Sequence, residues 1–197
     1  FMPSFVPAVI LFIWIPVSMW QNGDLNICRI EEPMPNARLT NLLIALFTLI
    51  MMLVALLYFQ MYLGLMPCPL CVSQRVFAIL TGVIALVAFV HNPAILGRRI
   101  YAGFTGLAAL GGALVASRQV WLQSLPEDQI PACGPTLDWM LEAQFPMAEV
   151  LRAMFLGEGS CAEIKWQLMG LSIPGWTLVA FVFLIGVAIF QLIRRAD

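Results

Sequence analysis

Charged side chains are scarce in this chain of 197 residues: they make up 11% of it, whereas 61% of the residues are hydrophobic. A soluble domain usually carries about 25% charged residues, so the composition excludes an ordinary water-soluble globular protein. The net charge is −1 at pH 7, and without a basic excess the chain lacks the electrostatic footprint of a nucleic-acid-binding protein. We therefore expect an integral membrane protein that does not bind nucleic acid and whose apolar surface faces lipid.

Four apolar runs are long enough to cross a bilayer as helices, which takes about 20 residues each. The predicted spans cover about residues 40–64, 72–91, 100–119 and 175–193. The third is rich in glycine and alanine, and such small residues let membrane helices pack closely, so we expect it inside a bundle. The predicted fold class is an all-α membrane protein, a four-helix transmembrane bundle.

Arginines at the span ends predict the orientation, because basic residues near spans mark the cytoplasmic side. They alternate as expected for four spans with both chain ends in the cytoplasm. The two remaining connections then face outward: a short one around a Cys-x-x-Cys motif and a long one covering about residues 122–173. The arginines are Arg38, Arg98 with Arg99, and Arg194 with Arg195.

The long outer loop contains a helical pattern of its own. Apolar residues recur there at the spacing of one helix face: Met147, Val150, Leu151, Met154 and Phe155. This stripe predicts a short helix lying in the membrane interface, which would hold the loop against the bilayer. A helix packed on the protein itself fits the pattern equally well.

The first 33 residues form a separate apolar segment. Residues 5–20 are apolar enough for a short span, but three prolines weaken them as a helix, and no basic residue precedes them as in a signal peptide. Residues 1–33 are therefore either an extra span or an extension unrelated to function, and residues 34–197 form the four-helix domain. Cys28 lies in this segment and is the odd one of five cysteines.

The other four cysteines fall on the outer side, where disulfide chemistry is allowed. A metal site is not expected, because structural zinc takes four Cys or His ligands, often in close pairs, and the only histidine, His91, is predicted at the opposite face. Two structural disulfides are the simpler alternative to a redox role. Cys68 and Cys71, however, form a Cys-x-x-Cys motif, which often contains a reactive thiolate.

Arg75 lies four residues after Cys71 on the same helical face, about one turn inside the bilayer, where a charge is costly and indicates function. Its alternative is an interfacial arginine whose head reaches the lipid headgroups. A lipid-soluble quinone could take electrons from such a dithiol, with Arg75 binding its carbonyl or the charge that develops there. The second pair, Cys133 and Cys161, could exchange with a soluble protein thiol. Together the two pairs predict a relay from water to lipid.

Three stretches give the chain a resemblance to a known family: PCPLCVSQR at 67–75, ACGPTLDWM at 132–140 and GSCAEIKWQLMGLSIPGW at 159–176. Over about residues 38–195 the chain resembles the disulfide bond formation protein B (DsbB) family, the quinone-linked thiol oxidases of the bacterial inner membrane. The DsbA–DsbB–quinone system keeps the bacterial periplasm oxidising. The resemblance therefore implies a multi-pass inner-membrane protein with both redox pairs on the periplasmic side.

The resemblance also implies a role for each site residue. Cys133 would be attacked by a reduced thioredoxin-fold oxidase of the DsbA type, and Cys161 would exchange with Cys68. Cys71 would contact the quinone, either ubiquinone or menaquinone, with the help of Arg75. The chain departs from the family pattern at Gln74, where members often carry Glu, and this weakens any role for a carboxylate there.

Two other functions stay open. A vitamin K epoxide reductase-like quinone oxidoreductase also has a Cys-x-x-Cys motif, but we expect that motif near the last helix of its bundle. Here the motif precedes the second of four spans, which disfavours this assignment. A disulfide-stapled membrane scaffold without turnover is the second alternative, and it would keep its function without Arg75.

Overall fold

The computed structural model describes residues 37–130 and 137–193. The predictions that concern residues 1–33 with Cys28, Cys133, and the pair Arg194 and Arg195 lie outside the described residues. Within them, four helices are long and apolar enough to cross a membrane: Ala37–Tyr62, Pro69–His91, Ile95–Gln123 and Ile173–Ile193. The predicted all-α architecture with four membrane-spanning helices is confirmed.

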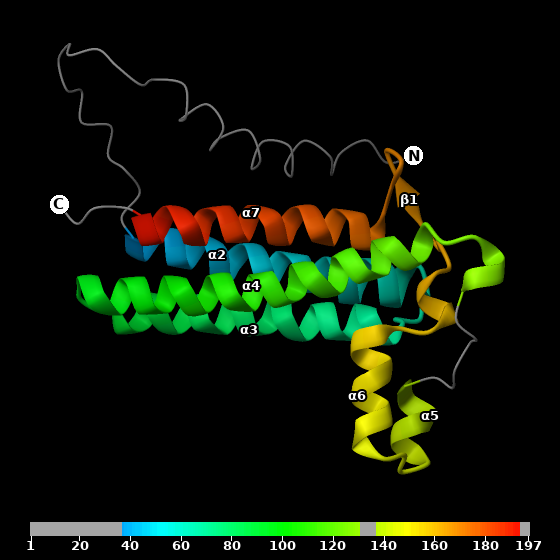
Figure 1. Ribbon diagram of the computed structural model, residues 1–197. Coiled ribbons are helices and arrows are strands. Elements are labelled where there is room, and N and C mark those ends of the chain that lie inside the picture. The colour runs from blue at the N-terminus through cyan, green and yellow to red at the C-terminus, as the bar shows by residue number, and fades with distance from the viewer. Residues whose placement is uncertain (1–36, 131–136, 194–197) are drawn as a thin grey trace. The chain divides into compact units, whose positions relative to one another are not determined.

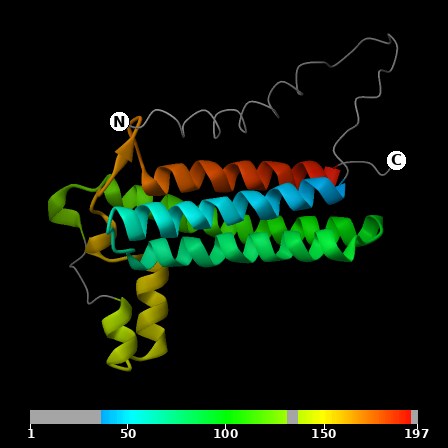
Figure 2. The same ribbon diagram turned by 180° about the vertical axis from the view of Figure 1, so that it is seen from behind.

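The first spanning helix has two parts, the α-helix α2 (Ala37–Leu53) and the π-helix η2 (Val54–Tyr62). The bundle is completed by α3 (Pro69–His91), α4 (Ile95–Gln123) and α7 (Ile173–Ile193). The four helices lie side by side in Figure 1 and, seen from behind, in Figure 2. α4 packs against both α3 and α7, and α2 packs mainly against α3.

Local sequence sets both ends of α3. Cys68 is its N-cap with extended backbone, and Pro69 follows at the first helical position, where its missing N–H costs nothing. The helix ends at Asn92, whose φ of 42° is in the left-handed region, and Pro93 cannot continue it. α4 begins shortly afterwards at Ile95 and extends beyond the predicted 100–119 at both ends, since residues 95–99 and 120–123 are helical too.

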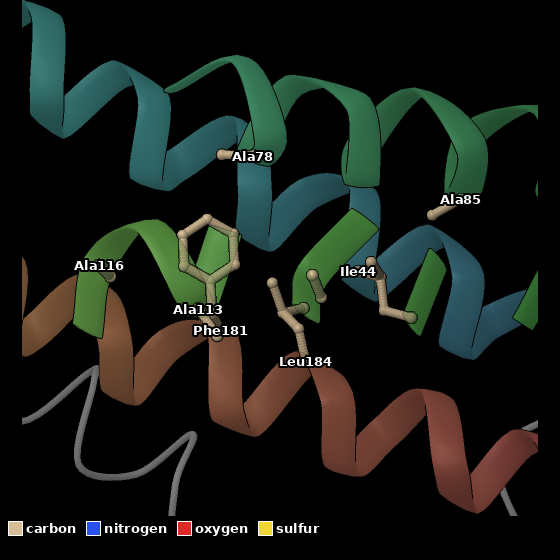
Figure 3. Close-up of a cluster of buried hydrophobic side chains, with 8 residues drawn as sticks. Ile44, Ala78, Ala85, Ala113, Ala116, Phe181 and Leu184 are labelled. Atoms are coloured by element: carbon tan, nitrogen blue, oxygen red, sulfur yellow. The ribbon is translucent and has the colours of Figure 1, made fainter. Parts of the chain in front are cut away.

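Small residues of α4 allow the helices to approach closely. Phe181 and Leu184 of α7 point toward α4, where Ala113 and Ala116 face them (Figure 3). Gly112 lies under the Phe181 ring, and a Cβ atom there would overlap with that ring. The prediction that the glycine- and alanine-rich helix lies inside the bundle is confirmed.

The connection between α4 and α7 is built from short elements. They are η3 (Glu127–Gln129), α5 (Leu137–Glu142), α6 (Met147–Leu156), η4 (Gly159–Cys161), β1 (Gln167–Leu168) and β2 (Leu171–Ser172). The two strands pair as an antiparallel hairpin. In both views α5 and α6 project from the end of the bundle where β1 lies (Figures 1 and 2).

The helix predicted from the apolar stripe is α6, but its stripe is divided. Val150 is buried in a small cluster with Met140, against which Met154 packs. The other three stripe residues are exposed: Met147, Leu151 and Phe155. One side of α6 therefore packs on the protein, and the other side presents an apolar surface.

Candidate functional site

The Cys-x-x-Cys motif is formed by the N-terminus of α3. Cys68 caps the helix and accepts a hydrogen bond from the backbone N–H of Cys71, with 3.4 Å between nitrogen and sulfur. The two sulfurs lie 3.0 Å apart, and both residues are half-buried free cysteines. A helix N-terminus favours negative charge through its dipole and its free N–H groups. The fold thus places the Cys-x-x-Cys motif at a helix N-terminus.

Cys161 is brought to this motif by the outer loop. It is 1% exposed and belongs to a buried cluster with Leu70 and Leu122, against which Cys68 packs. Two hydrogen bonds attach the end of α6 to the bundle. Ser73 Oγ donates to the Met154 carbonyl (2.6 Å), and Arg118 Nε donates to the Leu156 carbonyl (3.3 Å).

Gly157 makes this close attachment sterically feasible. Its φ of +77° is in the region that favours glycine. A Cβ atom at this position would lie 2.6 Å from Cδ1 of Leu70 and 2.8 Å from Cδ1 of Leu122. The chain can therefore turn out of α6, press against α3 and α4, and reach Cys161 within a few residues.

The thiols of Cys161 and Cys68 differ in acidity. A hydrogen bond from Cys68 lowers the pKa of Cys161 to about 7. Burial opposes this shift, and backbone N–H groups of Glu158 and Leu70 assist it. The same hydrogen bond to Cys161, a second one to Cys71, and burial raise the pKa of Cys68. In the reduced protein Cys68 therefore keeps its proton, and Cys161 is the nucleophile of the pair near neutral pH.

Amide side chains surround the two sulfurs of the motif. Gln119 of α4 is 3% exposed, and its Nε2 donates to Cys68 Sγ (3.3 Å) and to Cys71 Sγ (3.4 Å). Gln74 Nε2 donates to Gln119 Oε1 (2.7 Å), and Thr177 Oγ1 of α7 donates to Gln74 Oε1 (2.6 Å). One chain of hydrogen bonds thus runs from α7 through α3 and α4 to both sulfurs.

Arg75 is half-buried and contacts η2. Its Nη1 donates to Gln60 Oε1 (2.7 Å), and its Nη2 donates to the Ala55 carbonyl (3.3 Å). Arg75 and Cys71 also line one cavity of about 120 Å³. Most of the cavity wall is apolar, with contributions from Met51, Met52, Phe59, Ile173 and Phe181.

The structure brings four of the five predicted site residues to one end of the bundle: Cys68, Cys71, Cys161 and Arg75. Cys133 lies outside the described residues. Sequence reasoning missed Gln60, Gln119 and Thr177, and it discounted Gln74. A search for amides within the apolar spans would have found the three glutamines, because polar side chains in a membrane helix need partners.

The chain is similar in sequence to a known family of proteins. The family model described as "Disulfide bond formation protein DsbB" matches residues 37–191. A protein named "Disulfide bond formation protein B" from Saccharophagus degradans is 52% identical over 145 residues, which cover 74% of this chain and 87% of the relative. Another protein of that name, from Hahella chejuensis, is 53% identical over 138 residues, which cover 70% of this chain and 83% of the relative. A third, from Methylococcus capsulatus, is 44% identical over 161 residues, covering 82% and 95%.

No solved structure matches the chain significantly. The matches favour neither a vitamin K epoxide reductase-like enzyme nor a scaffold without turnover. The match covers well over half of the chain, and each of the three relatives covers more than two thirds of it. The chain therefore belongs to the disulfide bond formation protein B family, multi-pass membrane oxidoreductases that form disulfide bonds.

Proposed function

We propose that this protein reoxidises a thioredoxin-fold oxidase of the DsbA type and passes the electrons to a membrane quinone, ubiquinone or menaquinone. One observation carries the proposal: Cys68 packs against the cluster that holds Cys161, while Cys71 lines the apolar cavity together with Arg75. Electrons that arrive from the aqueous side at Cys161 can thus leave on the lipid side at Cys71.

Four thiol–disulfide exchanges make up the proposed relay, each an attack of a thiolate on a disulfide sulfur. The partner's thiolate attacks Cys133 of a Cys133–Cys161 disulfide and releases Cys161 as a thiolate. The second partner thiol then releases Cys133. The Cys161 thiolate attacks Cys68 of the Cys68–Cys71 disulfide, so the Cys161–Cys68 bond forms, the Cys68–Cys71 bond breaks, and the electron pair stays on Cys71. The Cys133 thiolate then attacks Cys161, which re-forms the Cys133–Cys161 bond and releases Cys68. The resulting Cys68–Cys71 dithiol would return to the disulfide by giving two electrons and two protons to the quinone.

The cavity residues fit a quinone. A quinone ring is flat and apolar with two acceptor oxygens, and the cavity offers apolar walls and the donating guanidinium of Arg75. When bound, the quinone supplies an acceptor for two electrons and two protons. Arg75 would donate a hydrogen bond to one ring oxygen and stabilise the negative charge that develops there. Cys71 would present its sulfur from the preceding turn of α3.

We further propose that residues 34–197 form the functional domain, that it lies in the bacterial inner membrane, and that both cysteine pairs face the periplasm. In support, the arginines at the opposite end of the bundle gather at neighbouring helix ends. The Arg38 guanidinium lies 4.9 Å from the centre of the Phe89 ring, and Arg98 donates to the Pro93 carbonyl. Basic residues at one end and thiols at the other fit the positive-inside rule.

The test combines purified full-length protein, a reduced DsbA-type oxidase and a soluble quinone analogue, and follows the quinone absorbance. We expect the wild-type protein to consume quinone in proportion to the partner dithiol added. Cys133→Ser is expected to abolish this consumption. Arg75→Ala is expected to reduce it at least about a hundredfold, the usual scale for removing one donor to a developing oxyanion.

Arg98→Ala is the matched control, since it removes an arginine at the other end of the bundle, and it is expected to leave the rate unchanged. Quinone consumption that is absent in the wild-type protein, or unaffected by Cys133→Ser, would overturn the proposal. Equal activity of Arg75→Ala and Arg98→Ala would remove the assigned role of Arg75.

A further inference from the structure

The hydrogen-bonded chain of Thr177, Gln74 and Gln119 has a direction. Gln74 and Gln119 are 6% and 3% exposed, and a buried amide must find a partner for its oxygen and its nitrogen. In Gln119 the oxygen accepts from Gln74 Nε2, and the nitrogen faces the sulfurs of Cys68 and Cys71. The oxygen of this side chain is therefore held by Gln74, and its N–H groups are left for the sulfurs.

Thr177 sets this direction. A hydroxyl group always carries one hydrogen to donate, and Thr177 Oγ1 lies 2.6 Å from Gln74 Oε1 and 3.0 Å from the Pro174 carbonyl. Donation along the shorter contact makes Gln74 Oε1 the acceptor and leaves Gln74 Nε2 to donate to Gln119 Oε1. Gln119 must then turn its N–H groups toward the two sulfurs.

We propose that Gln119 is a catalytic residue that acts on the Cys68–Cys71 pair: its amide N–H groups stabilise the thiolate that forms when this disulfide is opened. Gln74 and Thr177 are positioning residues that orient the Gln119 amide. The inference rests on the proposed relay, in which the electron pair of the broken Cys68–Cys71 bond stays on Cys71. That sulfur lies 3.4 Å from Gln119 Nε2, within hydrogen-bond reach for sulfur. A hydrogen bond to a charged group is about twice as strong as one between neutral groups.

The Gln119 amide can also bind the protonated thiol of Cys71. Cys71 Sγ lies 3.7 Å from Gln119 Oε1, so the thiol hydrogen has an acceptor in the same side chain. Gln119 thus meets the thiol with its oxygen and the thiolate with its nitrogen. A stabilised reduced form makes a dithiol pair a stronger oxidant, and Gln119 is therefore expected to make the Cys68–Cys71 disulfide easier to reduce.

The test equilibrates the full-length protein with glutathione buffers, without quinone or partner, and measures the fraction of reduced Cys68 and Cys71 by alkylation and mass spectrometry. Each disulfide consumes two glutathione thiols and releases one glutathione disulfide. Gln119→Met keeps the size of the side chain but removes the amide. We expect it to shift the equilibrium about tenfold toward the Cys68–Cys71 disulfide, the scale for losing one hydrogen bond to a charged group.

Gln74→Glu tests the direction of the chain. A carboxylate can only accept, so Gln119 would have to turn its N–H groups toward position 74 and its oxygen toward the sulfurs. This variant is expected to shift the equilibrium in the same sense as Gln119→Met, although it leaves Gln119 in place.

Thr177→Val removes the aiming hydroxyl and is expected to shift the equilibrium severalfold in the same sense, while Thr177→Ser is expected to restore it. Thr81→Val is the matched control, because the Thr81 hydroxyl donates to the Phe77 carbonyl of its own helix; no shift is expected. If Gln119→Met fails to fold, the two Thr177 variants decide the question.

An unchanged equilibrium in Gln119→Met, or a Thr177→Val shift no larger than that of Thr81→Val, would overturn this inference. The role of Gln119 can be disproved independently of the proposed function, because the glutathione equilibrium involves neither quinone nor partner. A wild-type protein that consumes no quinone contradicts the relay, whatever the glutathione result.

Discussion

The guanidinium of Arg75 is tied to Gln60 by a hydrogen bond of 2.7 Å that joins α3 to the π-helix η2. π-helical turns are rare and occur frequently at functional sites. Here the Ala55 carbonyl of η2 accepts a second hydrogen bond from Arg75, at 3.3 Å. The two acceptors hold a long, flexible side chain in one orientation along the cavity wall.

Gln60→Leu is expected to weaken quinone use, because Arg75 loses its closest hydrogen-bond partner and with it a fixed orientation. We expect the KM for a soluble quinone analogue to rise about tenfold, the scale of one hydrogen bond to a charged group. The glutathione equilibrium of Cys68 and Cys71 is expected to stay unchanged. Gln167→Leu, at an exposed position of β1, is the control. An unchanged KM would show that Gln60 does not orient Arg75.

The spanning helices could be predicted because each is an apolar run long enough for the bilayer, and chain composition alone records that property. The predicted start of α3 lies at about residue 72, whereas the helix begins at Pro69, a residue suited to the first helical position. The π-helical turn of η2 could not be predicted. Its sequence, VALLYFQMY, has the same apolar composition as the α-helix before it.

The amide network could not be predicted because its members come from different helices. Gln119, Gln74 and Thr177 are distant in the sequence, and only the packing of α3 against α4 and α7 brings them together. Gln74 was interpreted as the loss of a carboxylate, whereas the structure uses both ends of its amide. A carboxylate could not have donated to Gln119.

The reactivity of Cys161 is expected to follow pH with a midpoint near 7, because the Cys68 hydrogen bond lowers the Cys161 pKa to about 7. The thiolate, which is the reactive form, is lost as the pH falls through that value. The measurement is the relative alkylation rate of Cys161 in the reduced protein, resolved by mass spectrometry. Cys68→Ala removes the largest cause of the lowered pKa, so its profile is expected to move to higher pH. A profile that does not move would show that Cys68 does not set this pKa.

Gly157→Ala is expected to detach the segment that carries Cys161. The added methyl group would overlap with Leu70 and Leu122, and φ is +77° there. Overpacking of this kind typically costs about 1–3 kcal/mol, so we expect a lower thermal unfolding midpoint in detergent and faster alkylation of the buried Cys161. Gly103→Ala is the control, because among the described residues no atom beyond its own stretch of helix lies within 4 Å of the added carbon. If both variants alkylate equally, the close contact at Gly157 does not hold the segment.

The exposed apolar side of α6 is expected to lie in the membrane interface. Leu151 and Phe155 are 47% and 50% exposed there, and burying such side chains in an apolar phase contributes about 1.5–3 kcal/mol each. Leu151→Glu with Phe155→Glu should lift this side of α6 into water. In lipid nanodiscs, trypsin cleavage after Arg152 is then expected to increase about tenfold or more. Glu149→Gln, a change on the polar side of the same helix, is expected to leave cleavage unchanged. Equal cleavage of the double variant and the wild-type protein would show that this side of α6 does not contact lipid.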